Sequence, residues 1–256
     1  MISLFLFVLG AILGSFLNVC ALRLPRGESI VRPRSRCPRC LHLIAWYDNI
    51  PVLSFLVLGA RCRNCLEPIS ARYPAVEIAS GLLLMGLWRR WDGHGLWFLA
   101  AYAEAAVLLV VSLIDWDTFL IPDAFSLGLL AAGLAASPFN PYFGGGAAWR
   151  IGTSLLGAAA GFLMCWGIAL LGKAVFKKEA MGGGDVKLLA AVGAWSGVLG
   201  AFDCLMAASL LGSIYGVALM ARGRLKRQDP VPFGPFLAAG AALNLFYLIP
   251  FGFPFL

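Results

Sequence analysis

The chain has 256 residues, of which 61% are hydrophobic and only 13% are charged. Soluble domains carry about 25% charged residues, so this composition excludes an ordinary soluble domain and indicates an integral membrane protein. The 30 glycines and 14 prolines suit a polytopic helical bundle, because both residues are more frequent in transmembrane helices than in soluble ones. The net charge of +7 would also suit a nucleic-acid-binding protein, so the positions of the charges have to be considered.

Eight apolar runs are long enough to cross a membrane or nearly so. Their continuous hydrophobicity predicts helices, because the strands of a membrane barrel would alternate apolar and polar residues. No lysine or arginine precedes the first run, so the charged start of a cleaved signal peptide is missing, and we expect this run to be a retained span. The predicted spans are 2–22, 74–91, 96–114, 122–138, 150–172, 186–201, 203–221 and 233–250.

The positive charges lie in three loops. Loop 23–73 holds nine arginines, loops 173–187 and 222–229 hold four basic residues each, and only three of the 20 lysines and arginines lie elsewhere. With eight spans all three loops fall on one side, which the positive-inside rule identifies as cytoplasmic. Both termini are then outside, and the loop at 115–121 is also cytoplasmic. This topology, with attraction to anionic lipid, accounts for the basic surplus without nucleic-acid binding.

Loop 23–73 contains two C-x-x-C pairs, Cys37 with Cys40 and Cys62 with Cys65. Two such pairs predict a four-thiolate zinc site of the structural kind, because four protein ligands leave no open position for substrate. Disulfides are disfavoured because the arginines place the loop in a reducing compartment, and a redox dithiol does not need two matched pairs. The aromatic segment between the pairs suits either anchoring at the membrane interface or docking of a substrate.

A glycine-rich segment, Met181 to Lys187, places Asp185 at the start of the apolar run 186–201. Glycine has no Cβ, so the backbone can pack closely here and take torsions that other residues resist. A carboxylate at the mouth of a membrane span is costly, which favours a functional role. On this segment alone, a glycine turn followed by an aspartate that caps a helix remains the alternative.

A second aspartate, Asp115, directly follows the third apolar span, and the loop count places it on the same side and at a similar depth as Asp185. Two carboxylates a few Å apart cannot both ionise easily, so such a pair shares a proton and titrates as a unit. The ionised member can take a proton from water while the other polarises a peptide carbonyl. The pair therefore predicts an aspartyl protease centre. The roles of four other acidic residues stay open, although the two glutamates are ranked as structural: Asp117, Asp123, Glu77 and Glu104.

The order and spacing of these motifs resemble the type IV prepilin peptidases, the bifunctional leader peptidases and N-methyltransferases of pilus and type II secretion systems. The resemblance covers most of the chain. Its motifs are G-S-F-L-N-V at 14–19 with R-L-P at 23–25, the two C-x-x-C pairs, W-Y-D-N-I-P at 46–51, I-S-x-R-Y-P-x-V-E at 69–77, I-D-x-D at 114–117 with I-P-D at 121–123, and M-G-x-G-D-x-K-L at 181–188.

The resemblance implies that Asp115 and Asp185 are the catalytic aspartates of a GxGD-type membrane protease. The substrate would be a type IV prepilin or pseudopilin, cut on the cytoplasmic side of the bacterial inner membrane after a leader that ends in glycine. The new N-terminal residue would then be methylated from S-adenosylmethionine. This second activity rests on the resemblance alone, because the chain has no glycine-rich nucleotide fingerprint, and its cofactor-binding residues are unknown.

The sequence thus predicts an all-α polytopic membrane protein with about eight transmembrane helices and a small zinc-binding cytoplasmic loop between the first two. We divide it into a first helix at 1–22, a four-cysteine domain at 23–73 and a peptidase core at 74–256. A transporter or proton relay that uses Asp115 and Asp185 as an ion path is the alternative function, although the two halves lack the self-similarity of inverted repeats. A redox protein would need its cysteines on the oxidising side.

Overall fold

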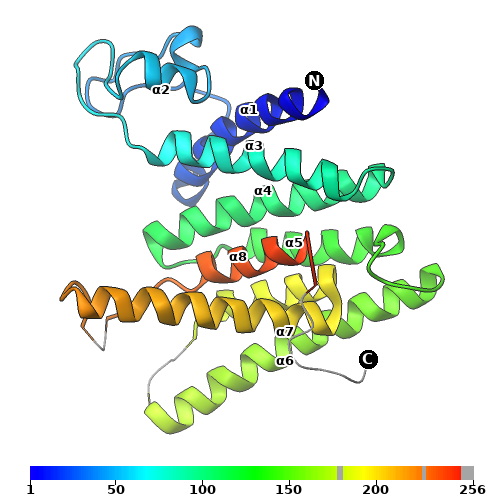
Figure 1. Ribbon diagram of the computed structural model, residues 1–256. Coiled ribbons are helices and arrows are strands. Elements are labelled where there is room, and N and C mark those ends of the chain that lie inside the picture. The colour runs from blue at the N-terminus through cyan, green and yellow to red at the C-terminus, as the bar shows by residue number, and fades with distance from the viewer. Residues whose placement is uncertain (178–180, 227–228, 249–256) are drawn as a thin grey trace. The chain divides into compact units, whose positions relative to one another are not determined.

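The computed structural model describes residues 1–177, 181–226 and 229–248 of the chain. The chain divides into two compact units, Met1–Asp92 and Gly93–Leu256. The described residues form helices joined by turns and two isolated bridges, and they include no strand (Figure 1). The predicted all-helical fold is therefore confirmed. Lys178, Arg227 and the last two positions of the predicted span 233–250 lie outside the described residues.

The first unit pairs two long helices, α1 (Ile2–Arg23) and α3 (Arg72–Arg90), which run antiparallel. Glycines on α1 allow the backbones to approach: a Cβ on Gly10 would lie 2.7 Å from the Ser80 carbonyl oxygen, and one on Gly14 would lie 2.8 Å from Glu77 Cα. The Ser80 hydroxyl donates a hydrogen bond to the Gly10 carbonyl at 2.7 Å. Small residues and hydroxyl bonds of this kind are the usual means by which membrane helices associate. Between the two helices lie η1 (Leu24–Arg26), η2 (Trp46–Asn49) and α2 (Leu53–Val57).

The second unit contains the remaining helices, which surround one apolar core. They are α4 (Gly95–Thr118), α5 (Asp123–Ala136), η3 (Ser137–Phe139), α6 (Ala147–Phe176), α7 (Gly183–Ala221) and α8 (Gly234–Asn244). The core is built from aliphatic side chains of α4, α5, α7 and α8, whereas long stretches of α6 expose theirs, as expected of a helix that faces lipid. The core residues include Leu108, Val111, Leu129, Leu188, Leu189, Val192 and Leu237.

Helix α7 is bent sharply at Gly197, whose φ of +73° and ψ of −171° are not helical. A straight helix would separate Asp185 from Tyr215 by about 45 Å. However, the Tyr215 ring lies 5.6 Å from the ring of Trp116, the neighbour of Asp115, and Asp115 interacts electrostatically with Asp185. The two parts of α7 therefore run in opposite directions, the first beside α6 and the second beside α8 (Figure 1).

Each part of α7 is held by close backbone contacts. In the first part, a Cβ on either Gly157 of α6 or Gly193 of α7 would collide with the carbonyl oxygen of the other. In the second part, the Asn244 side chain of α8 donates a hydrogen bond to the Gly200 carbonyl at 2.7 Å. This bond ties the beginning of the second part of α7 to α8. The bend and the packing of α7 on both neighbours thus support each other.

Each of the eight predicted apolar runs overlaps a helix, although α8 ends at Asn244, well before the end of the predicted run 233–250. The runs 186–201 and 203–221 both lie on α7, and the bend at Gly197 falls inside the first of them. Among the described residues, four helices are long and apolar enough to cross a membrane: Ile2–Arg26, Gly95–Thr118, Ala147–Val175 and Gly183–Ala221. Helix α5 is apolar but shorter, and α8 has 11 residues. The predicted count of eight spans therefore stays a prediction, whereas the polytopic helical class is confirmed.

Candidate active site

Asp185 is the third residue of α7, so the glycine-rich segment leads directly into a helix. The Gly182 N–H donates a hydrogen bond to Asp185 Oδ2 at 3.1 Å, as in a capping arrangement. The partial positive charge of a helix N-terminus also favours a carboxylate at this position. Asp185 therefore does cap the helix, as the simpler interpretation of the motif proposed. This capping does not exclude a catalytic role, because only Oδ2 receives this bond.

One glycine of this motif, Gly184, is needed for space, and none of the three is needed for an unusual torsion. Gly182 has ordinary extended values of φ −73° and ψ 149°, and Gly183 and Gly184 are helical. However, a Cβ on Gly184 would lie 2.9 Å from Cβ of Ile121, which precedes α5. The absence of a side chain at Gly184 therefore lets the start of α7 approach the α4–α5 connection.

Asp115 lies in the last turn of α4 and is 5% exposed. Its Oδ2 accepts a hydrogen bond of 2.9 Å from the N–H of Gly234, the first residue of α8. The C-terminal end of α4 disfavours a negative charge, whereas the N-terminal end of α8 favours one. A Cβ on Gly234 would lie 2.8 Å from Asp115 Oδ2, so only glycine fits there without moving the carboxylate. Gly234 thus positions Asp115.

The two aspartates meet at one end of the second unit. Ile121 links them: Cβ atoms built on Gly184 and on Gly234 would lie 2.9 Å and 3.1 Å from its side chain. The carboxylates are close enough that the charge of Asp115 acts on Asp185. Four elements therefore converge on one pair of carboxylates: α4, the segment before α5, α7 and α8.

The other two aspartates of this region lie in the solvent-exposed part of the connection. Asp117 and Asp123 are both exposed, and Asp123 Oδ1 forms an ion pair of 2.6 Å with Nζ of Lys187. This ion pair links the start of α5 to the start of α7, two residues from Asp185. The sequence left the role of Asp123 open and did not indicate this ion pair. Exposed ion pairs contribute only about 0–1 kcal/mol, so the pair positions more than it stabilises.

The four cysteine sulfurs of the first unit form a cluster in which every pair lies within 4.8 Å. The Sγ atoms of Cys37 and Cys65 are 3.8 Å apart. Such a donor set could hold a metal ion, and none of the seven cysteines forms a disulfide. The predicted ligands Cys37, Cys40, Cys62 and Cys65 are therefore brought together.

The two cysteine pairs have the same backbone design. In each, the N–H of the first cysteine donates to a carbonyl five residues later, Cys37 to His42 at 3.0 Å and Cys62 to Glu67 at 2.8 Å. The residue after each second cysteine is a leucine with φ of +59°. Two matched turns thus present four sulfurs to one point, as metal knuckles do.

The surroundings favour the thiolate form, which is the form that binds metal, at two of the four cysteines. A hydrogen bond from the Asn64 side chain lowers the pKa of the Cys40 thiol to about 6. Backbone hydrogen bonds from Cys65 and Asn64 lower the pKa of the Cys62 thiol. At Cys65 a backbone hydrogen bond from Glu67 is outweighed by burial and by the neighbouring thiols, which raise the pKa to about 12. An ion pair outside the sulfurs also joins the two cysteine turns, because Arg39 Nε lies 3.2 Å from Glu67 Oε1.

Comparison with known proteins places both units in one family. Residues 8–91 match the Bacterial Peptidase A24 N-terminal domain, and residues 102–217 match the Type IV leader peptidase family. The chain is 39% identical over 272 residues to a prepilin leader peptidase/N-methyltransferase of Burkholderia pseudomallei, with 96% of this chain and 86% of the relative covered. The chain belongs to the type IV leader peptidase family.

Two further relatives carry the same name. The protein of Myxococcus xanthus is 44% identical over 227 residues, which cover 87% of this chain and 64% of that protein. The protein of Pseudomonas aeruginosa is 35% identical over 270 residues, which cover 94% and 88%. No solved structure matches the chain. The predicted family is confirmed, and nothing in these comparisons supports a transporter.

The two family regions coincide with the two structural units. The N-terminal match lies wholly within Met1–Asp92, and the leader peptidase match lies wholly within Gly93–Leu256. The aspartate pair therefore belongs to the leader peptidase region and the cysteine cluster to the N-terminal one. The predicted division at residues 22 and 73 is not tested by this agreement and stays a prediction.

Two glutamates that the sequence left open have different surroundings. Glu77 on α3 accepts a hydrogen bond of 2.8 Å from the N–H of Val52, a residue with φ of +60°, and so holds the loop of the first unit. Glu104 lies within α4 and is 2% exposed. It precedes Asp115 by 11 residues, about 16 Å along the helix axis, so it is not part of the aspartate pair. Gly234 was missed altogether, although a glycine before Pro235 at the start of an apolar run is a helix-start signal.

Proposed function

We propose that this protein cuts the leader from type IV prepilins or pseudopilins with Asp115 and Asp185 as its catalytic pair. The observation that carries the proposal is the convergence of two carboxylates from α4 and α7 at one end of an apolar helical unit. The relatives are named prepilin leader peptidases/N-methyltransferases, which supplies the substrate class. The clustering of basic loops supports a cytoplasmic site in the bacterial inner membrane, with both termini outside.

The chemistry follows from one proton shared by two carboxylates. The ionised aspartate accepts a proton from water, and the resulting hydroxide adds to the peptide carbonyl carbon. The protonated aspartate donates to the carbonyl oxygen, and the tetrahedral intermediate then collapses as the amide nitrogen leaves with a proton. The Gly234 N–H, bound to Asp115 at 2.9 Å, holds one carboxylate in place throughout.

Substitution of either aspartate by asparagine tests the catalytic assignment. The protein is assayed in membranes with a pilin precursor that carries its leader, and Asp115→Asn and Asp185→Asn should each lower the cleavage rate by at least about 10²–10⁴-fold. Asp92→Asn removes an exposed carboxylate from the other unit and should leave the rate unchanged. Normal cleavage by either catalytic variant would overturn the assignment.

The cysteine cluster fits a structural zinc ion. Zinc bonds thiolates at about 2.3 Å in a tetrahedron, which places sulfurs about 3.8 Å apart, and the sulfurs of Cys37 and Cys65 lie at this separation. Zinc held by Cys37, Cys40, Cys62 and Cys65 would have no open coordination position. Its role would therefore be to fold the loop between α1 and α3 rather than to catalyse. Metal analysis of the purified protein, with Cys37→Ser as the comparison, tests this; a metal-free wild type would overturn it.

The methyltransferase activity in the relatives' names requires a second site, and the first unit offers a cavity for it. This cavity has a volume of about 800 Å³ and is lined by the cysteine loop and by α1 and α3. Pockets of about 300–1,000 Å³ hold ligands of cofactor size. Four acidic side chains line it, namely Glu28, Asp48, Glu67 and Glu77, together with four arginines. A lining of both charges suits S-adenosylmethionine, which carries a cationic sulfonium with the methyl group and also an amino and a carboxylate group.

Binding of the methyl donor can be measured without any transfer. Photo-cross-linking of radiolabelled S-adenosylmethionine to the purified protein should weaken in Glu28→Gln, because one of the carboxylates that attract the cation is lost. Leader cleavage should be unchanged, since the catalytic pair lies in the other unit. Asp92→Asn is the matched control, as it removes an acidic charge outside the cavity. Equal labelling of all three proteins would exclude this cavity.

A further inference from the structure

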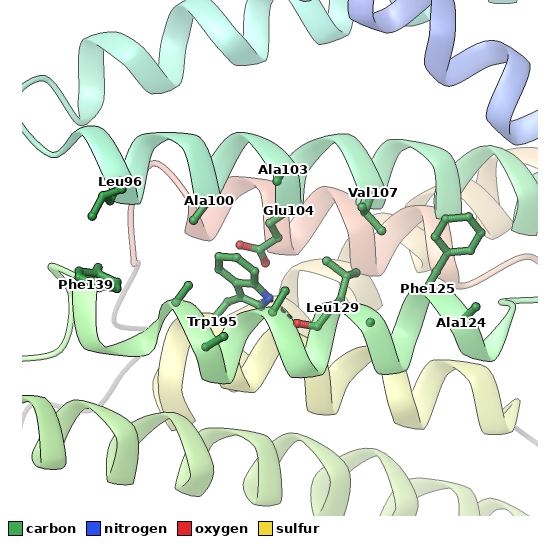
Figure 2. A pocket seen from close by; sticks show the side chains of 14 residues that line it. Leu96, Ala100, Ala103, Glu104, Val107, Ala124, Phe125, Leu129, Phe139 and Trp195 are labelled. Carbon is green, nitrogen blue, oxygen red and sulfur yellow. Dashed lines mark hydrogen bonds between the residues drawn. The ribbon is translucent and has the colours of Figure 1, made fainter. Parts of the chain in front are cut away.

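A second cavity lies within the leader peptidase unit, along the groove between α4 and α5 (Figure 2). Its volume is about 460 Å³, and its lining is apolar apart from one carboxyl group and the indole of Trp195. Six of the lining residues are alanines and one is a glycine, among them Ala100, Ala103 and Ala132. Small residues of this kind let the backbone of another membrane helix approach closely.

Glu104 is the one carboxyl group in this groove. Figure 2 shows its side chain between α4 and α5, beside the ring of Trp195. Glu104 is 2% exposed, and its Oε2 has no hydrogen-bond partner in the described part of the chain. Trp195 does not satisfy it, because the indole N–H donates to the Leu129 carbonyl at 2.9 Å. A buried carboxyl group without a partner is costly, so the groove lacks one hydrogen-bond donor.

One end of the groove lies toward the catalytic pair, although neither aspartate lines it. That end is lined by Ala124 and Phe125, which directly follow Asp123, the partner of Lys187 beside Asp185. Glu104 itself lies on the same helix as Asp115, about 16 Å away along the axis. A helical segment in the groove would therefore place one end at the aspartates while its middle faces Glu104.

We propose that this groove binds the apolar helix of the precursor that is cleaved, and that Glu104 pairs with a hydrogen-bond donor on that helix about 16 Å from the cut. This inference rests on the proposed function, because it names where that substrate lies. Because the groove runs toward the aspartates, its occupant should be the substrate rather than a lipid. A lipid tail would fill the small-residue groove, but it would leave Glu104 without a donor.

Filling the groove tests the proposal. Ala132→Phe places a large side chain in it, and Ala131→Phe places the same side chain on α5 at a residue that does not line it. Two substrates are compared: a full precursor, and a short peptide that spans the cut but stops before the apolar helix. Ala132→Phe should raise KM for the full precursor about tenfold or more while kcat is retained. The short peptide and Ala131→Phe should behave as in the wild type.

Glu104 is tested in the same assay. Glu104→Gln keeps a hydrogen-bonding group and should change KM for the full precursor less than threefold, whereas Glu104→Leu should raise it about tenfold. Equal loss with both substrates would mean a distorted catalytic site, and no change with either would mean that the groove holds lipid; both outcomes overturn the proposal.

Cross-linking separates this proposal from the peptidase assignment. A photo-reactive residue at position 132, in protein inactivated by Asp115→Asn, should cross-link to the apolar segment of the precursor, and the same residue at position 131 should not. If the wild type failed to cleave while this cross-link formed, the peptidase assignment would fall and the groove would stand. Cleavage without the cross-link would overturn the groove alone.

Discussion

The two units of this chain assemble their candidate sites in different ways. In the first unit, four thiols converge from within residues 37–65, and two matched turns hold them. In the second unit, Asp115 and Asp185 come from distant helices, and the N–H groups of Gly234 and Gly182 orient them. The first site depends on local turns and on the metal that we propose for it, whereas the second depends on how closely helices pack. Each should therefore fail under a different perturbation.

Removal of the metal should have the largest effect, and it should be confined to the first unit. Structural zinc contributes about 10–16 kcal/mol of apparent binding energy in small zinc-binding peptides, so a loop that lacks a large apolar core should unfold without it. We expect a chelator, or Cys37→Ser, to make residues 23–73 sensitive to limited proteolysis. Methyl transfer should be lost with the cavity.

The second unit provides the control for this experiment. Its helices pack through their own apolar core, so α4 to α8 should stay resistant to protease after chelation, and a short peptide substrate should still be cut. If chelation unfolded both units together, the contrast between a local and a packed site would be wrong.

Addition of a single methyl group at Gly234, in the second unit, should have the next largest effect. Gly234→Ala places a Cβ 2.8 Å from Asp115 Oδ2, so the carboxylate must move. Because small displacements of a catalytic group can cost about 10²-fold in rate, we expect a loss of this size in leader cleavage with the protein still folded. Gly95→Ala is the matched control, since a Cβ there meets nothing within 4 Å. Wild-type kinetics in Gly234→Ala would show that the contact does not position Asp115.

The same contrast explains what the sequence could predict. Cys37, Cys40, Cys62 and Cys65 were predictable because their spacing is local and no other arrangement uses two matched pairs. The apolar runs were predictable because continuous hydrophobicity reports membrane helices directly. Asp115 and Asp185 were predictable as a pair only through the side of the membrane that the basic loops assign to them.

Features that depend on tertiary contact were beyond the sequence. Nothing in the segment around Gly234 indicates which carboxylate it faces, and the sharp reversal of α7 at Gly197 falls inside the predicted run 186–201 rather than at the predicted break at residue 202. The ion pair of Lys187 with Asp123 joins residues 64 positions apart. Glu104 was ranked as structural because its lack of a partner emerges only when α4 packs on α5.

Reversal of the charge of Asp117, at the acidic connection between α4 and α5, should have a smaller effect on cleavage. The resemblance to the prepilin peptidases also implies a basic leader on the precursor, so exposed aspartates beside the catalytic pair should attract it. Asp117 and Asp123 are both exposed, so Asp117→Lys, which changes the charge by two, should raise KM about three- to tenfold, and more than Asp123→Asn, which changes it by one. The measurement is cleavage at low and at high salt, since salt screens such attraction. A salt-independent KM in the wild type would exclude this role.

The smallest expected effect is a pH dependence of the stability of the first unit that comes from an ion pair rather than from the cysteine thiols. The Arg63 guanidinium donates two hydrogen bonds to Asp48, at 2.8 Å and 2.7 Å, and these lower the pKa of that carboxyl. A carboxyl whose folded pKa is depressed contributes stability above its unfolded pKa of about 3.9, and this contribution is lost as the pH falls through the folded value. The ion pair should therefore hold η2 against the second cysteine turn at neutral pH and release it only in acid.

Acid also protonates the metal ligands, so the test has to compare two proteins. Protease resistance of residues 23–73 should fall with pH in both the wild type and Asp48→Asn, but the difference between them should be present at neutral pH, begin to shrink below about pH 4 and vanish once the pH is below the folded pKa of Asp48. A difference that grew in acid would have the wrong sign for this ion pair. Because exposed pairs contribute little, the difference should also be far smaller than the effect of chelation, which would leave the metal as the main source of order in the first unit.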